Sequence, residues 1–220
     1  MLGDADTGWT RRGLWAGVLC APWFLLSLIV FGALEPGYSH RYKAVSELGA
    51  FGVRYGLWMN LFGFLMTGVL VILAALAYHR VLKQASLGVS AAAWLLVLGV
   101  SLAGTAVPAD MQAMMQSPWT VIHLAFSFFG LLPFAVAAIL TGRRVRQLGV
   151  RPVASRVIQW LPVCLVPAFM LYGFTDQRGL VQRLTILLVL GWVGALCWGL
   201  LTRSGGTADH KPAAHAGEVS

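Results

Sequence analysis

Apolar residues occur in six long runs, separated by shorter segments in which the charged residues gather. A membrane-spanning helix needs about 20 mostly apolar residues. No run alternates with period two, as barrel strands do. Backbone groups in hydrocarbon need partners within their own segment, so each run is predicted to be a helix. The pattern predicts an all-α membrane protein, a bundle of six transmembrane helices. The runs are Leu14–Leu34, Gly56–Tyr78, Gly88–Val107, Val121–Leu140, Val157–Phe174 and Leu184–Leu201.

Composition supports lipid as the main solvent of this chain. Hydrophobic residues make up 58% of the 220 residues and charged residues only 11%, whereas a soluble domain carries roughly 25% charged residues. These values exclude a soluble globular domain and a disordered chain. The three cysteines fall in three different runs, where they are expected to be small buried hydrophobes.

The basic residues predict the orientation of the bundle. Eleven of the 16 Lys and Arg residues fall on the side of the membrane that holds both termini, and five on the other. Basic loops stay in the cytoplasm, so both termini are predicted to be cytoplasmic. The net charge of +8 comes mainly from basic residues at the span ends, and nucleic-acid binding is not expected, because no basic module is long enough to fold by itself. The connection after the fourth run contributes most: Arg143, Arg144, Arg146, Arg151 and Arg156.

Three regions follow from this pattern. Residues 1–13 form a cytoplasmic N-terminal segment, and residues 14–201 form the six-helix transmembrane domain. Residues 202–220 are small and polar and are predicted to be a disordered cytoplasmic tail. Small residues recur every fourth position in the last run, at Gly191, Ala195 and Gly199. Such spacing lets helices approach closely, within one bundle or in a homo-oligomer, and the sequence leaves both open.

The first outer loop, Glu35–Tyr55, is long for a connection between helices. A Pro36-Gly37 turn is followed by Tyr38, Tyr42, Val45 and Leu48, which recur at helical spacing. We therefore expect a short interfacial helix, with its tyrosines at the depth of the headgroups. The loop is expected to fold back over the outer mouth of the bundle.

All three outer connections carry polar residues at one predicted membrane depth. Ser46 and Glu47 lie in the first loop, Asp110 ends the third helix, His123 is one turn into the fourth, and Arg183 begins the last. Partly buried charges are costly unless they are paired. We therefore expect these five residues to form one ligand-binding site, in which Arg183 or a charged His123 compensates the carboxylates.

Several short motifs carry a resemblance to a known family. Together they resemble the bacterial and archaeal membrane family called domain of unknown function 998, over about residues 14 to 201. The resemblance implies a six-span prokaryotic membrane protein and no particular reaction, and it supports treating the five polar residues as one site. The motifs are Pro36-Gly37-Tyr38-Ser39, Ser46-Glu47-Leu48-Gly49, Pro108-Ala109-Asp110, His123 and Gly179-Leu180-Val181-Gln182-Arg183.

The sequence favours a protein of the bacterial cytoplasmic (inner) membrane. Its extracytoplasmic polar pocket would bind a lipid headgroup or a small polar ligand. A small-solute transporter stays open, although transporters usually place their site at the midplane. A membrane-embedded metal-dependent hydrolase using His40, Glu47, Asp110 and His123 also stays open. No cofactor or bound metal is expected, membrane lipids are the expected partners, and the residues do not decide whether a reaction is catalysed.

Overall fold

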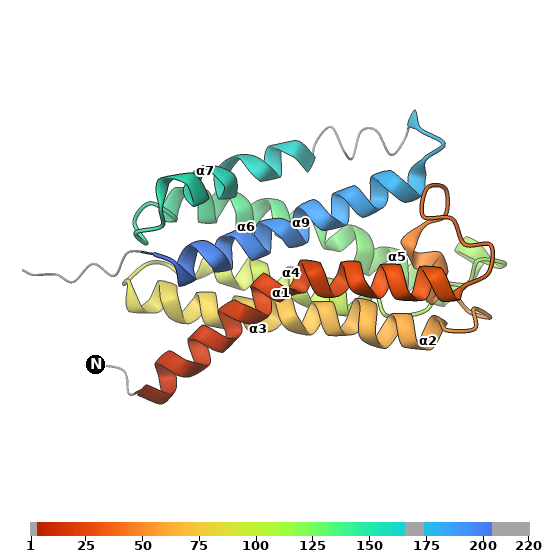
Figure 1. The fold of residues 1–220 in the computed structure, drawn as a ribbon, viewed down its shortest axis with the longest axis horizontal. Helices are drawn as coiled ribbons and strands as arrows, with labels where there is room; N and C mark the ends of the chain where they lie inside the picture. The colour runs from red at the N-terminus through yellow and green to blue at the C-terminus, as the bar shows by residue number, and fades with distance from the viewer. Residues whose placement is uncertain (1–3, 166–173, 204–220) are drawn as a thin grey trace, which may run out of the picture.

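The computed structural model describes residues 4–165 and 174–203, and in this part the chain forms helices and no strands. Several helices run side by side along the long axis of the molecule (Figure 1). The elements in chain order are α1 (Asp4–Leu34), η1 (Val45–Gly49), α2 (Gly56–Trp58), η2 (Met59–Leu65), α3 (Met66–Gln84), α4 (Ser90–Gly104), η3 (Met114–Gln116), α5 (Pro118–Phe129), α6 (Leu131–Arg144), α7 (Pro152–Trp160), η4 (Leu161–Cys164) and α9 (Arg178–Leu201).

Within the described residues, four helical stretches are long and apolar enough to cross a membrane. They are Thr7–Leu34, Gly56–Gln84, Pro118–Arg144 and Arg178–Leu201. Each of them contains one of the predicted runs in full. The protein is therefore an all-α, multi-pass membrane protein, as the apolar pattern predicted.

The two other predicted runs have different outcomes. Gly88–Val107 contains α4, whose 15 residues span about 22 Å, less than the roughly 30 Å of a hydrocarbon core. Of Val157–Phe174, residues 166–173 lie outside the described part, as does most of the predicted tail, residues 204–220. At the other terminus, α1 begins at Asp4, ten residues before the predicted span.

Two features of the first helices expose backbone carbonyls. Pro22 lies inside α1 and lacks the N–H that the helix would use, which accounts for the bend of α1 (Figure 1). The segment η2 is a π-helix, a form that often marks functional sites. The Phe62 carbonyl of η2 accepts a hydrogen bond of 2.6 Å from the Trp23 indole. A side chain of α1 thus satisfies a carbonyl of the neighbouring helix.

Small residues bring the helices close together. A Cβ atom on Gly68 of α3 would lie 2.4 Å from the backbone nitrogen of Ala103 in α4. A Cβ on Gly99 of α4 would lie 2.9 Å from the Ile72 nitrogen. Only glycine permits this approach of α3 and α4. α1 packs against α3 and α9, and α4 packs against α6.

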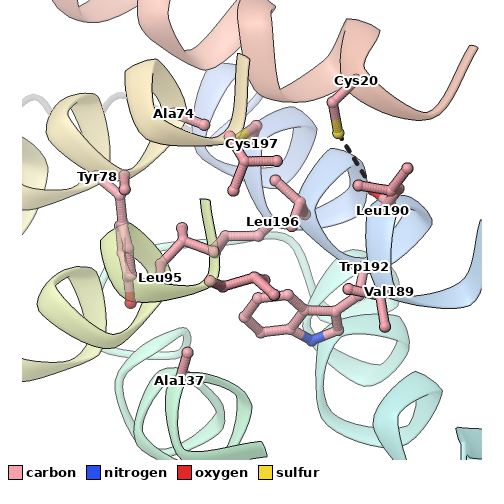
Figure 2. Close-up of a cluster of buried hydrophobic side chains, with 14 of the residues drawn as sticks. Cys20, Ala74, Tyr78, Leu95, Ala137, Val189, Leu190, Trp192, Leu196 and Cys197 are labelled. Atoms are coloured by element: carbon pink, nitrogen blue, oxygen red, sulfur yellow. Dashed lines mark hydrogen bonds between the residues drawn. The ribbon is translucent and has the colours of Figure 1, made fainter. Parts of the chain in front are cut away.

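The buried core lies where α3, α4, α6 and α9 meet (Figure 2). Trp192 of α9 is fully buried, and its indole donates to the Ile158 carbonyl of α7 at 2.8 Å. The Tyr78 hydroxyl of α3 bonds Thr141 of α6 at 3.3 Å. The Cys20 thiol of α1 points to the Leu190 carbonyl of α9 in Figure 2. These polar groups each have a partner on another helix, which ties the helices together inside an apolar interior.

Candidate functional site

Loop 1, residues 35–55, is ordered by turns and by one short helix. Gly37 has a φ of 69° and the Tyr38 N–H donates to the Glu35 carbonyl, so the Pro-Gly turn forms as expected. The helix η1 is a single 3-10 helix over Val45–Gly49. It is shorter than the predicted helix because Tyr38 and Tyr42 precede it in turns. Ser46 and Glu47 lie within η1, both partly buried.

Arg183 is buried at the start of α9, with 7% of its surface exposed. Its Nη1 donates to the Lys43 carbonyl at 3.0 Å and to the Gly179 carbonyl at 2.6 Å. Its Nη2 donates to the Tyr38 hydroxyl, which in turn donates to the Ala44 carbonyl at 2.9 Å. All of these acceptors are neutral. The guanidinium therefore links loop 1 to α9 through hydrogen bonds. Its Nε is buried without a hydrogen-bond partner.

The first turn of α9 is shaped to receive loop 1. A Cβ on Gly179 would lie 2.3 Å from the Lys43 carbonyl oxygen, so only glycine fits there. The Leu180 N–H donates to the Arg41 carbonyl at 3.1 Å. The Gln182 Oε1 accepts from the Val45 N–H at 2.8 Å. The first turns of α9 thus contact the backbone of residues 41–45 through Gly179, the Leu180 N–H and the Gln182 side-chain carbonyl.

Electrostatics around Arg183 involve three side chains of loop 1. Burial raises the pKa of Tyr38 to about 12, while the charge of Arg183 opposes this rise and that of Glu47 adds to it. Partial burial lowers the pKa of His40, and the charge of Arg183 lowers it further. The carboxylate of Glu47 also accepts the Ala44 N–H at 2.7 Å. At neutral pH the phenol of Tyr38 and the imidazole of His40 are therefore uncharged beside the Arg183 guanidinium.

Asp110 and His123 occupy a second cluster. The Asp110 carboxylate accepts the N–H groups of Gln112 and Ala113, both at 3.0 Å. The Asp110 N–H donates to the Thr120 hydroxyl at 2.8 Å. His123 Nδ1 lies 2.8 Å from the Val107 carbonyl, and because a carbonyl only accepts, Nδ1 carries the proton. Asp110 and His123 thus both lie where the third loop contacts α5, but they have different hydrogen-bond partners.

Loop 1 connects the two clusters. The Phe51 N–H donates to the Ala109 carbonyl at 3.0 Å, and the Asn60 amide donates to the Gly49 carbonyl at 2.8 Å. The structure therefore brings the first and third loops and the start of α9 to one end of the bundle, here called the loop-1 end. It places Glu47 near Arg183 and Tyr38, with Ser46 beside Glu47 in η1, and it places Asp110 and His123 at the contact of the third loop with α5.

Three contributors to the Arg183 cluster were not among the predicted site residues. Tyr38 was expected only as a headgroup anchor, and Gln182 and Gly179 only as parts of a motif. The signal was present in the spacing: Gly179 precedes Arg183 by four residues, one helical turn. The expected partners of Arg183 were carboxylates, whereas its hydrogen bonds go to a phenol and two backbone carbonyls.

A metal-dependent hydrolase at the loop-1 end would need at least three metal ligands close together. No group of three or more His, Cys, Asp or Glu side chains could hold a metal ion in the part of the chain that the structure describes. His40, Glu47, Asp110 and His123 all belong to that part. Their side chains are instead engaged with loop backbone or neighbouring rings.

A comparison with protein families places the chain. The model of the family described as "Protein of unknown function (DUF998)" matches residues 18–199. The chain belongs to this family. The match contains both clusters at the loop-1 end and agrees with the resemblance carried by the short motifs. No curated protein and no solved structure matches the chain.

Proposed function

We propose that this DUF998 protein binds an anionic group, a lipid headgroup or a small phosphate-bearing ligand, at the loop-1 end. Arg183 supplies the positive charge. Tyr38 orients the guanidinium, and Ser46 offers a hydroxyl in the adjacent turn. Asp110 and His123 belong to the wall of the same region, where they hold the third loop against α5.

The observation that supports the proposal is the burial of the Arg183 cation among neutral hydrogen-bond acceptors. A buried cation is stable only when it is paired or fully hydrogen-bonded. The acceptors bonded to Arg183 are neutral, its Nε is buried without a partner, and the Glu47 carboxylate, whose charge acts on Arg183, is bonded to the Ala44 N–H. A bound anion would complete this site, because guanidinium groups favour phosphate and carboxylate in bidentate geometry.

The proposal includes an arrangement in the membrane. Six helices would cross a bacterial inner membrane with both termini in the cytoplasm, and η1 would lie in the outer interface. The basic residues after α6 support this orientation, since they belong at the cytoplasmic surface. Reporter fusions to the connection at residues 145–151 test it, and an extracytoplasmic location of that connection would overturn it.

Ligand-dependent stability in a neutral detergent tests the binding proposal. Unfolding midpoints are measured with glycerol phosphate and with a short-chain anionic phospholipid, which separates a soluble ligand from a headgroup. We expect at least one of them to raise the wild-type midpoint, and the increase to be smaller in Arg183→Lys and in Ser46→Ala. Arg178→Gln is the matched control, because Arg178 is exposed at the start of the same helix.

Three results would overturn the binding proposal. Neither ligand raises the wild-type midpoint, or Arg183→Lys responds as the wild type does, or Arg178→Gln loses the response as fully as Arg183→Lys. Uptake of a solute by proteoliposomes that depends on Arg183 would instead identify the site as part of a transporter.

A further inference from the structure

A cavity of about 960 Å³ lies between α6, α7, η4 and α9, with Thr185 of α9 in its lining. Its wall is almost wholly apolar along α6, from Leu131 and Leu132 to Ile139. Two arginines, Arg143 and Arg146, line it where α6 ends. The cavity therefore has a long apolar part and a cationic end.

The cavity is open along its length. Leu132, Ile139 and Val163 on its wall are each more than half exposed. In a membrane protein such side chains face hydrocarbon, so an acyl chain can enter from the side. Gln159 and Gly142 line the cavity near its cationic end, and the Gln159 amide donates to the Gly142 carbonyl of α6 at 3.2 Å. This bond bridges α6 and α7 beside the arginines.

The dimensions match one leaflet of a bilayer. Leu132 and Arg143 are eleven residues apart on one helix, which corresponds to about 16 Å. Half of a hydrocarbon core is roughly 15 Å. A lipid whose phosphate lies at the arginines would therefore place its acyl chain along the whole apolar wall.

Charge selects among the lipids that could fit. Arg143 and Arg146 are both exposed and line the cavity, whereas Arg151 and Arg156, which follow in the chain, are exposed outside its lining. Basic residues at the membrane surface attract anionic headgroups. We propose that this cavity is a binding site for an anionic glycerophospholipid, with its phosphate on Arg143 and Arg146 and an acyl chain between α6 and η4. The cationic end of this site lies at the end of α6 that is opposite the loop-1 end (Figure 1), and the lining also includes Thr185 of α9, two residues from Arg183.

Native mass spectrometry of the purified full chain tests this site. The protein is stripped of lipid in a neutral detergent and titrated with equal amounts of phosphatidylglycerol and phosphatidylcholine of the same chain length. We expect the wild type to retain more phosphatidylglycerol, and Arg143→Gln/Arg146→Gln to lose this preference by at least about fivefold. Ala135→Trp, at an exposed position of the cavity wall, should lower the binding of both lipids.

Two control variants separate this site from general surface charge and from the Arg183 cluster. Arg151→Gln/Arg156→Gln removes the same charge from exposed residues outside the cavity lining and should keep the preference. Arg183→Lys should also keep it, so a failed headgroup site at the loop-1 end would leave this result unchanged. Unfolding midpoints close to the wild-type value show that the variants are folded.

The proposal is overturned if the wild type binds both lipids equally. It is also overturned if the control pair loses the preference as fully as Arg143→Gln/Arg146→Gln, because general surface charge then explains it. Glycerol phosphate without acyl chains should not compete; full competition would remove the role of the apolar wall and overturn the proposal.

Discussion

The two ends of the bundle differ in the burial of their arginines. At the loop-1 end, Arg183 is buried and its guanidinium bonds carbonyls and a phenol from distant parts of the chain. At the other end, Arg143 and Arg146 are exposed on the rim of an apolar cavity. A buried cation that is bonded to distant parts of the chain is therefore expected to contribute strongly to stability, whereas an exposed cation contributes little.

Replacing Arg183 gives the largest expected difference between the ends. Arg183→Met leaves the Lys43 and Gly179 carbonyls and the Tyr38 hydroxyl without their donor. We expect the free energy of unfolding to fall by about 3 kcal/mol, measured by denaturation in detergent. Arg143→Gln should change it by less than about 0.5 kcal/mol. Equal losses of unfolding free energy in the two variants would contradict the claim that Arg183 stabilises the fold and Arg143 does not.

A pair of glycines on α9 tests how closely loop 1 docks. Gly179→Ala would place a Cβ 2.3 Å from the Lys43 carbonyl oxygen, and backbone cannot easily move away. We expect a loss of about 2 kcal/mol in the free energy of unfolding.

The matched control is Gly191→Ala, because nothing lies within 4 Å of a Cβ at Gly191. That change should be neutral or stabilise the helix by up to about 1 kcal/mol. If both alanine variants had the same stability, loop 1 would not be held against α9 in solution.

Asp110 sharpens the distinction between the two clusters of the loop-1 end. Its carboxylate accepts two backbone N–H groups, so Asp110→Ala should cost about 1 kcal/mol and Asp110→Asn much less. The same denaturation assay measures both. The double variant Asp110→Ala/Arg183→Met should show additive losses. A coupling above about 1 kcal/mol would indicate that Asp110 is a partner of Arg183 after all.

The smallest expected effect is a pH dependence from His40. Its pKa is lowered in the folded protein, so the unfolded chain binds a proton more readily. Stability should therefore fall as the pH drops below the ordinary histidine pKa of about 6.5. Unfolding midpoints between about pH 7.5 and 5.5 should decline less in His40→Gln than in the wild type. An identical decline in both proteins would show that His40 does not contribute to the pH dependence of stability.

The helical, multi-pass character of this protein could be predicted from its sequence, and the polar residues of the outer loops could be named there as candidates for a site. These follow from local rules: the length of apolar runs, the need to satisfy backbone groups in lipid, and turn residues such as Pro36-Gly37. The same rules placed Ser46 and Glu47 in a short helix before Gly49.

The hydrogen-bond partners of Arg183 and the position of the lipid-sized cavity, by contrast, depend on how the helices pack against one another. The Lys43 carbonyl lies 140 residues before Arg183 in the chain, and every residue has a carbonyl, so no sequence pattern marks that acceptor. The cavity likewise depends on how far α6, α7 and α9 stand apart. Both are properties of distances between helices, which are set by packing of the whole bundle and not by the residues of any one segment.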